Sequence, residues 1–151
     1  MSERRILALG VFDLFHVGHL RYIEYAKQQG THLTVAVMAD AVGIATKNKR
    51  PVIAESERLE IIRSLRCVDE AYLQPCSTEY EDEAAVWIAA WDIHHVVGGG
   101  GWEGSPRWNR LIPALDKRGI SASFAPYTEG VSTTQLLSSI LQSAGGEGIG
   151  A

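Results

Sequence analysis

The chain has 151 residues, of which 46% are hydrophobic and 21% are charged, and its formal net charge is −4. A length of about 100–200 residues is typical of one domain, and this composition is ordinary for a soluble globular protein. The acidic balance argues against a nucleic-acid-binding protein, which neutralises backbone phosphates with Lys and Arg, but it allows an enzyme that binds one nucleotide.

Short strand-like segments alternate with helix-like segments along the chain. The apolar run Leu33–Met38 is typical of a strand buried on both faces of a parallel sheet, and Leu59, Ile62 and Leu65 form a helical stripe. Strands are predicted at Arg5–Gly10, Leu33–Met38, Glu70–Gln74, His94–Gly98 and Ile120–Ala125. Helices are predicted at Val17–Gln29, Glu55–Arg66, Glu81–Trp91, Pro106–Arg118 (kinked or broken at Pro113) and Ser132–Gln142 (capped by Ser132 or Thr133), with a cationic loop at Thr46–Pro51.

This alternation predicts an α/β fold: a single-domain, Rossmann-like, open and mainly parallel five-stranded sheet with helices on both faces. We expect residues 1–144 to form this domain and the glycine-rich residues 145–151 to form a disordered tail. In sheets of this kind ligands bind beyond the carboxyl ends of the strands, so functional residues should follow the predicted strands.

We expect a cytoplasmic protein without membrane contact. The N-terminal residues lead directly into the first strand, without the roughly 7–15-residue apolar region of a signal peptide. No segment approaches the about 18 consecutive apolar residues of a membrane span. Cys67 and Cys76 are too few, and too far apart, for a disulfide framework or a structural zinc site.

The first strand-to-helix connection carries two histidines, His16 and His19. Two imidazoles three residues apart at the start of a helix can point at the same place, where the free N–H groups of the helix favour an anion. Gly18 would let a phosphate come close to the backbone, because glycine has no Cβ. Taken alone, such a motif more often consists of structural histidines beside a turn.

Further segments follow the pattern of one known family. Residues 10–27, GVFDLFHVGHLRYIEYAK, resemble the first motif of the cytidylyltransferase-like nucleotidyltransferases, and TEGVSTTQLL (Thr128–Leu137) resembles the motif that precedes their last helix. The resemblance runs over residues 5–140. Within the family the chain most resembles the glycerol-3-phosphate cytidylyltransferases.

The resemblance implies a nucleotidyltransferase. Such an enzyme would transfer CMP from CTP to a phosphorylated small molecule, such as glycerol 3-phosphate or a similar phospho-alcohol or phosphonate, and release pyrophosphate. An acceptor oxygen attacks the α-phosphorus in line, while the protein positions the groups and offsets their charge. The resemblance further implies Mg²⁺ bound with the triphosphate, a homodimer, and no nucleic-acid partner.

The resemblance also implies roles for individual residues. We expect no metal to be held by protein side chains. The catalytic residues are expected to be His16, His19, Lys47 and Lys49. The nucleotide is expected to contact Gly10, Val11, Phe12, Asp13, Gly18, Asp40, Arg66, Gly99, Thr128, Ser132, Thr133 and Thr134. The acceptor is expected to contact Asp13, Lys47, Arg58 and Trp102.

Several of these residues have a structural alternative. Lys47 and Lys49 can belong to a solvated basic loop. Arg66 can pair with Asp69 or Glu70, and Ser132 can simply cap the last helix.

Two departures from the family pattern leave the base open. Tyr127 stands where the glycerol-3-phosphate enzymes carry an arginine, and Gly100 and Gly101 replace two aspartates. The heptose-phosphate adenylyltransferases share these features, so one alternative is an adenylyltransferase that uses ATP and a sugar phosphate such as heptose 1-phosphate. A non-catalytic nucleotide-binding module is another. A dehydrogenase is excluded, since no G-x-G-x-x-G follows the first predicted strand.

Overall fold

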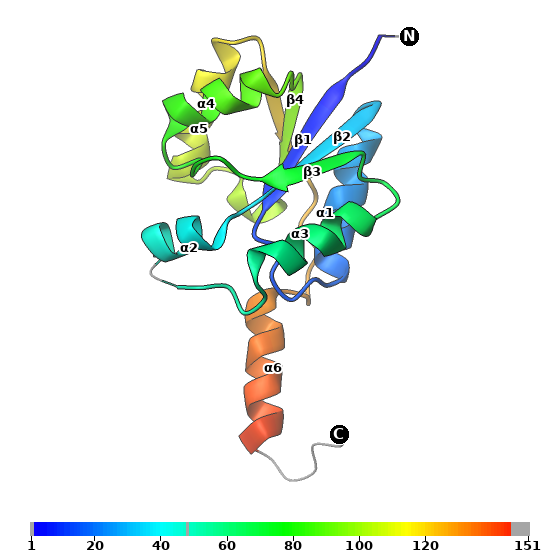
Figure 1. Ribbon diagram of the computed structural model, residues 1–151, viewed down its shortest axis with the longest axis vertical. Coiled ribbons are helices and arrows are strands. Elements are labelled where there is room, and N and C mark those ends of the chain that lie inside the picture. The colour runs from blue at the N-terminus through cyan, green and yellow to red at the C-terminus, as the bar shows by residue number, and fades with distance from the viewer. Residues whose placement is uncertain (1, 48, 146–151) are drawn as a thin grey trace.

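Five parallel strands form one sheet in the order β3-β2-β1-β4-β5 (Figure 1). The computed structural model describes residues 2–47 and 49–145, except for the side chains of Thr46 and Lys47. All strand pairs are parallel, which confirms the predicted Rossmann-like α/β fold. The strands are β1 (Arg5–Gly10), β2 (His32–Val37), β3 (Glu70–Leu73), β4 (His95–Gly98) and β5 (Ser121–Phe124).

Helices cover both faces of the sheet, as the sequence predicts. On one face α1 (Val17–Gln28) and α3 (Glu55–Ser64) bury Ile23 and Ile62 in a core with Val35 and Val97. On the other face α4 (Glu81–Ala90) and α5 (Pro106–Asp116) bury Ile88, Leu111 and other apolar side chains against β1 and β4. Each fully buried Leu, Ile or Val contributes about 1.5–3 kcal/mol relative to an exposed one.

Two local features differ from the sequence prediction. The segment before the cationic loop is a helix, α2 (Asp40–Lys47), so the loop itself is shorter than predicted. Pro113 lies inside α5 without ending the helix. A helical proline costs one backbone hydrogen bond and crowds the preceding turn, but α5 buries Leu111, Ala114 and Leu115 on either side of it, and this packing holds the helix.

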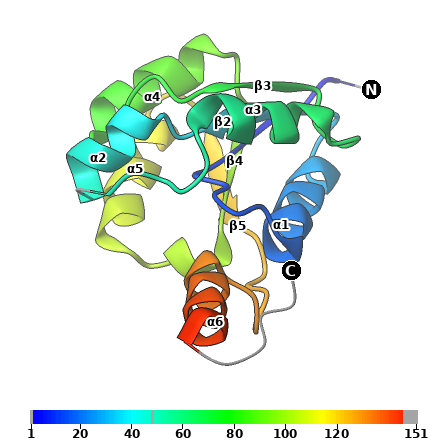
Figure 2. The same cartoon turned by 60° about the horizontal axis from the view of Figure 1, so that its bottom comes forward.

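The last helix, α6 (Thr133–Gly145), extends away from the sheet (Figure 1). Figure 2 shows it apart from α1, α3, α4 and α5. The Ser132 Oγ accepts a hydrogen bond from the Gln135 backbone N–H at 3.0 Å, so Ser132 caps the helix as predicted. None of the residues of α6 is buried. Of the predicted tail, residues 146–151 lie outside the described residues.

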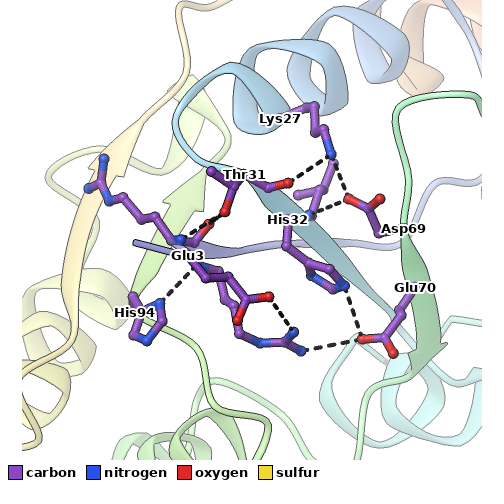
Figure 3. Close-up of polar contacts among 10 residues, drawn as sticks. Glu3, Lys27, Thr31, His32, Asp69, Glu70 and His94 are labelled. Carbon is purple, nitrogen blue, oxygen red and sulfur yellow. Dashed lines mark hydrogen bonds and ion pairs between the residues drawn. The ribbon is translucent and has the colours of Figure 1, made fainter. Parts of the chain in front are cut away.

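Charged side chains join the first three strands at their amino ends (Figure 3). The Arg5 guanidinium lies 3.3 Å from the Glu70 carboxylate, and the Lys27 amine lies 2.6 Å from Asp69. Burial opposes ionisation of Asp69, but hydrogen bonds from Lys27 and from the Leu33 N–H outweigh it and keep the pKa of this carboxyl below its usual value. These pairs fix the amino-terminal edge of the sheet.

None of the helices formed by residues 2–47 and 49–145 is long and apolar enough to cross a bilayer.

Candidate functional site

A cleft of about 550 Å³ opens at the carboxyl ends of the strands. It runs from the end of β3, at one edge of the sheet, past β1 to the segment after β5, at the other edge. The start of α6 forms part of its wall. Predicted site residues that line it are Gly10, Val11, Phe12, Asp13, His16, Gly18, His19, Lys49, Gly99, Trp102, Thr128, Ser132, Thr133 and Thr134.

The two histidines cap α1 with each other's help. His16 is the N-cap residue, and its Nδ1 accepts a hydrogen bond from the Gly18 N–H at 3.0 Å. The backbone N–H of His16 donates to Nδ1 of His19 at 3.3 Å, and the two rings stack with centroids 3.8 Å apart. Because both Nδ1 atoms accept, each neutral ring carries its proton on Nε2. These hydrogen bonds leave Nε2–H as the remaining donor of each ring.

Burial keeps both imidazoles neutral at neutral pH. It lowers the pKa of His19 to about 4, with the nearby His16 adding to this shift and Asp13 opposing it. Burial also lowers the pKa of His16 below its usual value. Neutral rings can donate hydrogen bonds to an oxyanion without being permanent cations. An anionic ligand would raise both pKa values, since a nearby negative charge favours the protonated ring.

The histidine motif meets the start of α6, which follows it by more than a hundred residues. Thr133 Oγ1 donates to the backbone carbonyl of Asp13 at 3.0 Å. A Cβ on Gly18 would come within 2.8 Å of the His16 ring, so glycine lets His16 cap the helix in this geometry. The structure thus brings His16, His19 and Thr133 to one cleft.

Asp13 organises this end of the cleft. It is 8% exposed, and its two carboxylate oxygens accept from the backbone N–H groups of Val52 and Ile53, at 2.8 and 2.9 Å. Asp13 therefore fixes the chain that follows the basic residues Lys49 and Arg50, both of which line the cleft.

Arg58 and Asp40 lie beneath the cleft, where the sequence predicts ligand contacts. Arg58 is only 1% exposed; its guanidinium donates to Asp40 at 2.7 Å and to the carbonyls of Val11, Met38 and Ile53. Burial opposes ionisation of Asp40, yet hydrogen bonds from Arg58 and Glu55 keep the pKa of Asp40 below its usual value. Neither residue lines the cleft, and the contacts that the structure shows for both hold the surrounding loops in position; their ligand contacts stay a prediction.

Arg66 and Lys47 are the remaining residues that the sequence predicts at the site. Arg66 is exposed and does not line the cleft. Among residues 2–47 and 49–145 it is not seen paired with Asp69 or Glu70, whose ion pairs are with Lys27 and with Arg5 and His32. The side chain of Lys47 lies outside the described residues.

The glycine segment after β4 touches the chain after β5. A Cβ on Gly100 would lie 2.5 Å from the Ala125 carbonyl and 2.8 Å from the Tyr127 nitrogen, so only glycine fits there. At Gly99 and Gly101 the nearest atoms would be 3.6 and 3.9 Å away, which leaves room for a side chain. The backbones of the two segments therefore lie close together in the wall of the cleft, and the glycines add no side chains to it.

The structure adds cleft residues that the sequence analysis did not name individually, although Thr78 and Arg107 lie in the loops 76–82 and 101–108, which the sequence predicts to form the acceptor pocket. Gln74 and Thr78 follow β3 and are buried at the β3 end. The rule that ligand-binding residues follow strands could have found them. Arg107, near the start of α5, also lines the cleft; its position depends on how α5 packs, for which the sequence gives no local signal.

Residues 7–137 match the cytidylyltransferase-like family. The chain belongs to this family. It is 37% identical to a FAD synthase of Methanobrevibacter ruminantium over 125 residues, which span 78% of this chain and 75% of that protein. Among solved structures, a lipopolysaccharide core biosynthesis protein from Thermoplasma volcanium superimposes with a TM-score of 0.66 at 26% identity, over 84% of this chain and 98% of that one.

Other relatives are matched over less of their length. A FAD synthase of Thermococcus onnurineus is 42% identical over 78 residues, 51% of this chain and 52% of that protein. The bifunctional protein HldE of Hydrogenovibrio crunogenus is 30% identical over 148 residues, 97% of this chain and 29% of that protein. The chain thus spans about half the length of the first of these relatives and less of the second. These family members are FAD synthases and HldE, not glycerol-3-phosphate cytidylyltransferases, so the finer resemblance is not supported.

Proposed function

We propose that this protein transfers AMP from ATP to a phosphorylated small molecule and releases pyrophosphate. The observation that carries the proposal is the convergence of two neutral imidazoles and the hydroxyl-rich start of α6 on one cleft. Such an arrangement offers hydrogen-bond donors to phosphate oxygens from two sides. Membership of a nucleotidyltransferase family supports the same class of reaction.

Two observations favour adenine over the CTP that the sequence first suggested. FAD contains an AMP unit, so relatives named FAD synthase imply adenylyl transfer in those proteins. The glycines at positions 99 and 101 leave the cleft wall without side chains, which gives room for a two-ring purine. Gly100 and Gly101 also stand where glycerol-3-phosphate cytidylyltransferases carry carboxylates.

The chain's residues would act by positioning and by offsetting charge. A phosphate oxygen of the acceptor attacks the α-phosphorus of ATP; the new P–O bond forms as the bond to the bridging oxygen breaks, and pyrophosphate leaves. The Nε2–H groups of His16 and His19 would donate to oxygens that gain negative charge, with Lys49 and the start of α6 beside them. No covalent intermediate on the protein is needed.

Mg²⁺ is proposed only as a companion of the triphosphate. In the part of the chain that the structure describes, no group of three or more His, Cys, Asp or Glu side chains could hold a metal ion. Both carboxylate oxygens of Asp13 already accept backbone hydrogen bonds. These residues do not fit a protein-held ion, and no step is assigned to one.

A pyrophosphate-release assay tests the proposal. ATP, CTP, GTP and UTP would be paired with FMN, sugar 1-phosphates, phosphonates and glycerol 3-phosphate. We expect turnover with ATP and one acceptor class. Preference for CTP would overturn the choice of base in favour of the cytidylyl alternative. Nucleotide binding without turnover for any pair would instead indicate a non-catalytic binding module.

We also propose a homodimer in the cytoplasm. Ile140 and Leu141 on α6 are 56% and 71% exposed and offer an apolar surface to a second copy. Light scattering after size exclusion tests this, and a mass near 16.5 kDa would contradict it.

A further inference from the structure

Arg107 presents unused hydrogen-bond donors to the cleft. Its side chain is 19% exposed, and its guanidinium lies 5.0 Å over the ring of Trp102. Its ion pair is with Glu79, whose oxygen is 4.0 Å away, too far for a hydrogen bond. Within residues 2–47 and 49–145, no protein acceptor takes a hydrogen bond from this guanidinium. Five N–H groups are therefore available to a ligand.

The contacts of Arg107 place it between the segment after β4, where Trp102 lies, and the loop after β3. Its carboxylate neighbour, Glu79, directly follows Thr78, which lines the cleft with Gln74 beyond the end of β3. The histidines and the start of α6 lie instead beyond β1 and β5. If the triphosphate binds at the histidines and the base lies beside Gly99 and Gly101, the space from Arg107 to the β3 end is left for the acceptor.

We propose that Arg107 binds an anionic group of the acceptor, separate from the phosphate that attacks the nucleotide. The acceptor class is therefore a small molecule with a carboxylate or a second phosphate besides its reacting phosphate. This inference rests on the proposed function, since it takes the histidine end of the cleft as the triphosphate site.

The surroundings of Arg107 suit such a ligand. A guanidinium presents paired, coplanar N–H groups that match the two oxygens of a carboxylate or phosphate. The contact with the face of Trp102, 5.0 Å away, restrains the guanidinium beside the cleft before the ligand arrives. Glu79 is half-exposed and holds Arg107 only weakly, so the acceptor's anion can take its place.

The test uses two pairs of probes that differ in one carboxylate: glycerol 3-phosphate against 3-phosphoglycerate, and glucose 1-phosphate against glucuronate 1-phosphate. Calorimetry measures the binding of each probe to the protein saturated with a non-hydrolysable ATP analogue. We expect the carboxylated member of at least one pair to bind about tenfold more tightly or better, as a charge-assisted bidentate contact allows.

Variants then assign this preference to Arg107. In Arg107→Gln the preference should fall to near unity, with unchanged affinity for the ATP analogue, and Arg107→Lys should keep part of it. Arg110→Gln is the matched control, because Arg110 lies on the same helix and pairs with Glu81, but does not line the cleft. A thermal melt of each variant excludes misfolding as the cause.

Three outcomes would overturn the inference: carboxylated probes that bind no better than their partners without the carboxylate, a preference that survives Arg107→Gln, or a loss of ATP-analogue affinity in that variant. Failure of the proposed function is distinct from these. It would show as a wild-type protein that does not bind the ATP analogue at all.

Discussion

The two ends of the sheet use polar groups differently. At the amino ends of the strands the charged side chains pair with one another: Arg5 with Glu70 and Lys27 with Asp69. At the carboxyl ends the imidazole Nε2–H groups and the guanidinium of Arg107 face a cleft without a hydrogen-bonding partner among the described residues. Paired polar groups stabilise the fold, whereas unpaired donors facing a cleft are available to a ligand.

The carboxyl end also contains paired groups: Arg58 beneath the cleft and Asp13 in its wall. Arg58 donates hydrogen bonds to the backbone of the loops that carry the exposed donors, and Asp13 accepts hydrogen bonds from it. The carboxyl end therefore has one layer of polar groups whose donors are free in the cleft and a second, positioning layer that holds the loops. Five substitutions or conditions can separate these layers from each other and from the amino-terminal edge.

The largest effect is expected from the positioning layer. Arg58→Met should lower the free energy of unfolding by about 3–5 kcal/mol, because it leaves Asp40 without its cation and three carbonyls without their donor. Denaturant unfolding measures this loss. Arg66→Met, on an exposed arginine nearby in the chain, is the control and should change stability by less than about 0.5 kcal/mol. A loss below about 1 kcal/mol for Arg58→Met would contradict the positioning role.

His16→Asn should separate the ligand-binding role of this side chain from its role in capping α1. An asparagine side chain is a good N-cap and can accept from the Gly18 N–H, but it lacks the Nε2–H donor. We expect kcat/KM for pyrophosphate release to fall about 10²–10³-fold with little loss of stability. His16→Ala should lose the same activity and, in addition, about 1 kcal/mol of stability. Wild-type turnover in His16→Asn would refute a catalytic role for the ring.

Gly100→Ala should damage the wall between the chains after β4 and β5. Its Cβ would meet the Ala125 carbonyl at 2.5 Å, so the two segments must separate, at a cost of about 1–3 kcal/mol. Gly101→Ala is the matched control, because its Cβ has no neighbour closer than 3.9 Å. Thermal melts and ATP titrations of the two variants should differ, and equal behaviour would show that the wall is not as tight as described.

Acidification should lower the free energy of unfolding because His19 takes up a proton in the unfolded chain. The pKa of His19 is about 4 in the folded protein against an ordinary 6.5, so between these pH values the unfolded chain binds a proton that the folded chain does not. Stability from this group is complete above pH 6.5 and is lost as the pH falls toward 4, by about 1–2 kcal/mol once solvent screening is included. His19→Asn should remove this part of the pH dependence. An identical pH profile for wild type and variant would contradict it.

The smallest effect is expected at the amino-terminal edge. Lys27→Met removes a partly exposed ion pair with Asp69 and should cost at most about 1 kcal/mol. It should leave kcat and both KM values unchanged, since the pair lies at the opposite end of the strands from the cleft. A change in turnover would show that the two ends are coupled.

The sequence by itself determined the five strands and, apart from α2, the α-helices in their order. Apolar periodicity is a local signal, so strands such as Leu33–Met38 and helices such as Glu81–Trp91 are found to within one or two residues. The strand–helix alternation determines a parallel sheet, and a parallel sheet places the loops after its strands on one edge. The meeting of the histidine motif with the last helix follows from this topology.

Only the tertiary structure decided which side chains face the cleft. Arg58, Arg66 and Arg107 look alike in sequence, yet one is buried under the cleft, one is exposed away from it and one lines it. Likewise, Gly100 is confined by a chain segment 25 residues later. Such outcomes depend on contacts between distant segments, which local patterns do not encode, and a guanidinium on a long flexible stem can reach solvent, backbone or ligand from the same helix position.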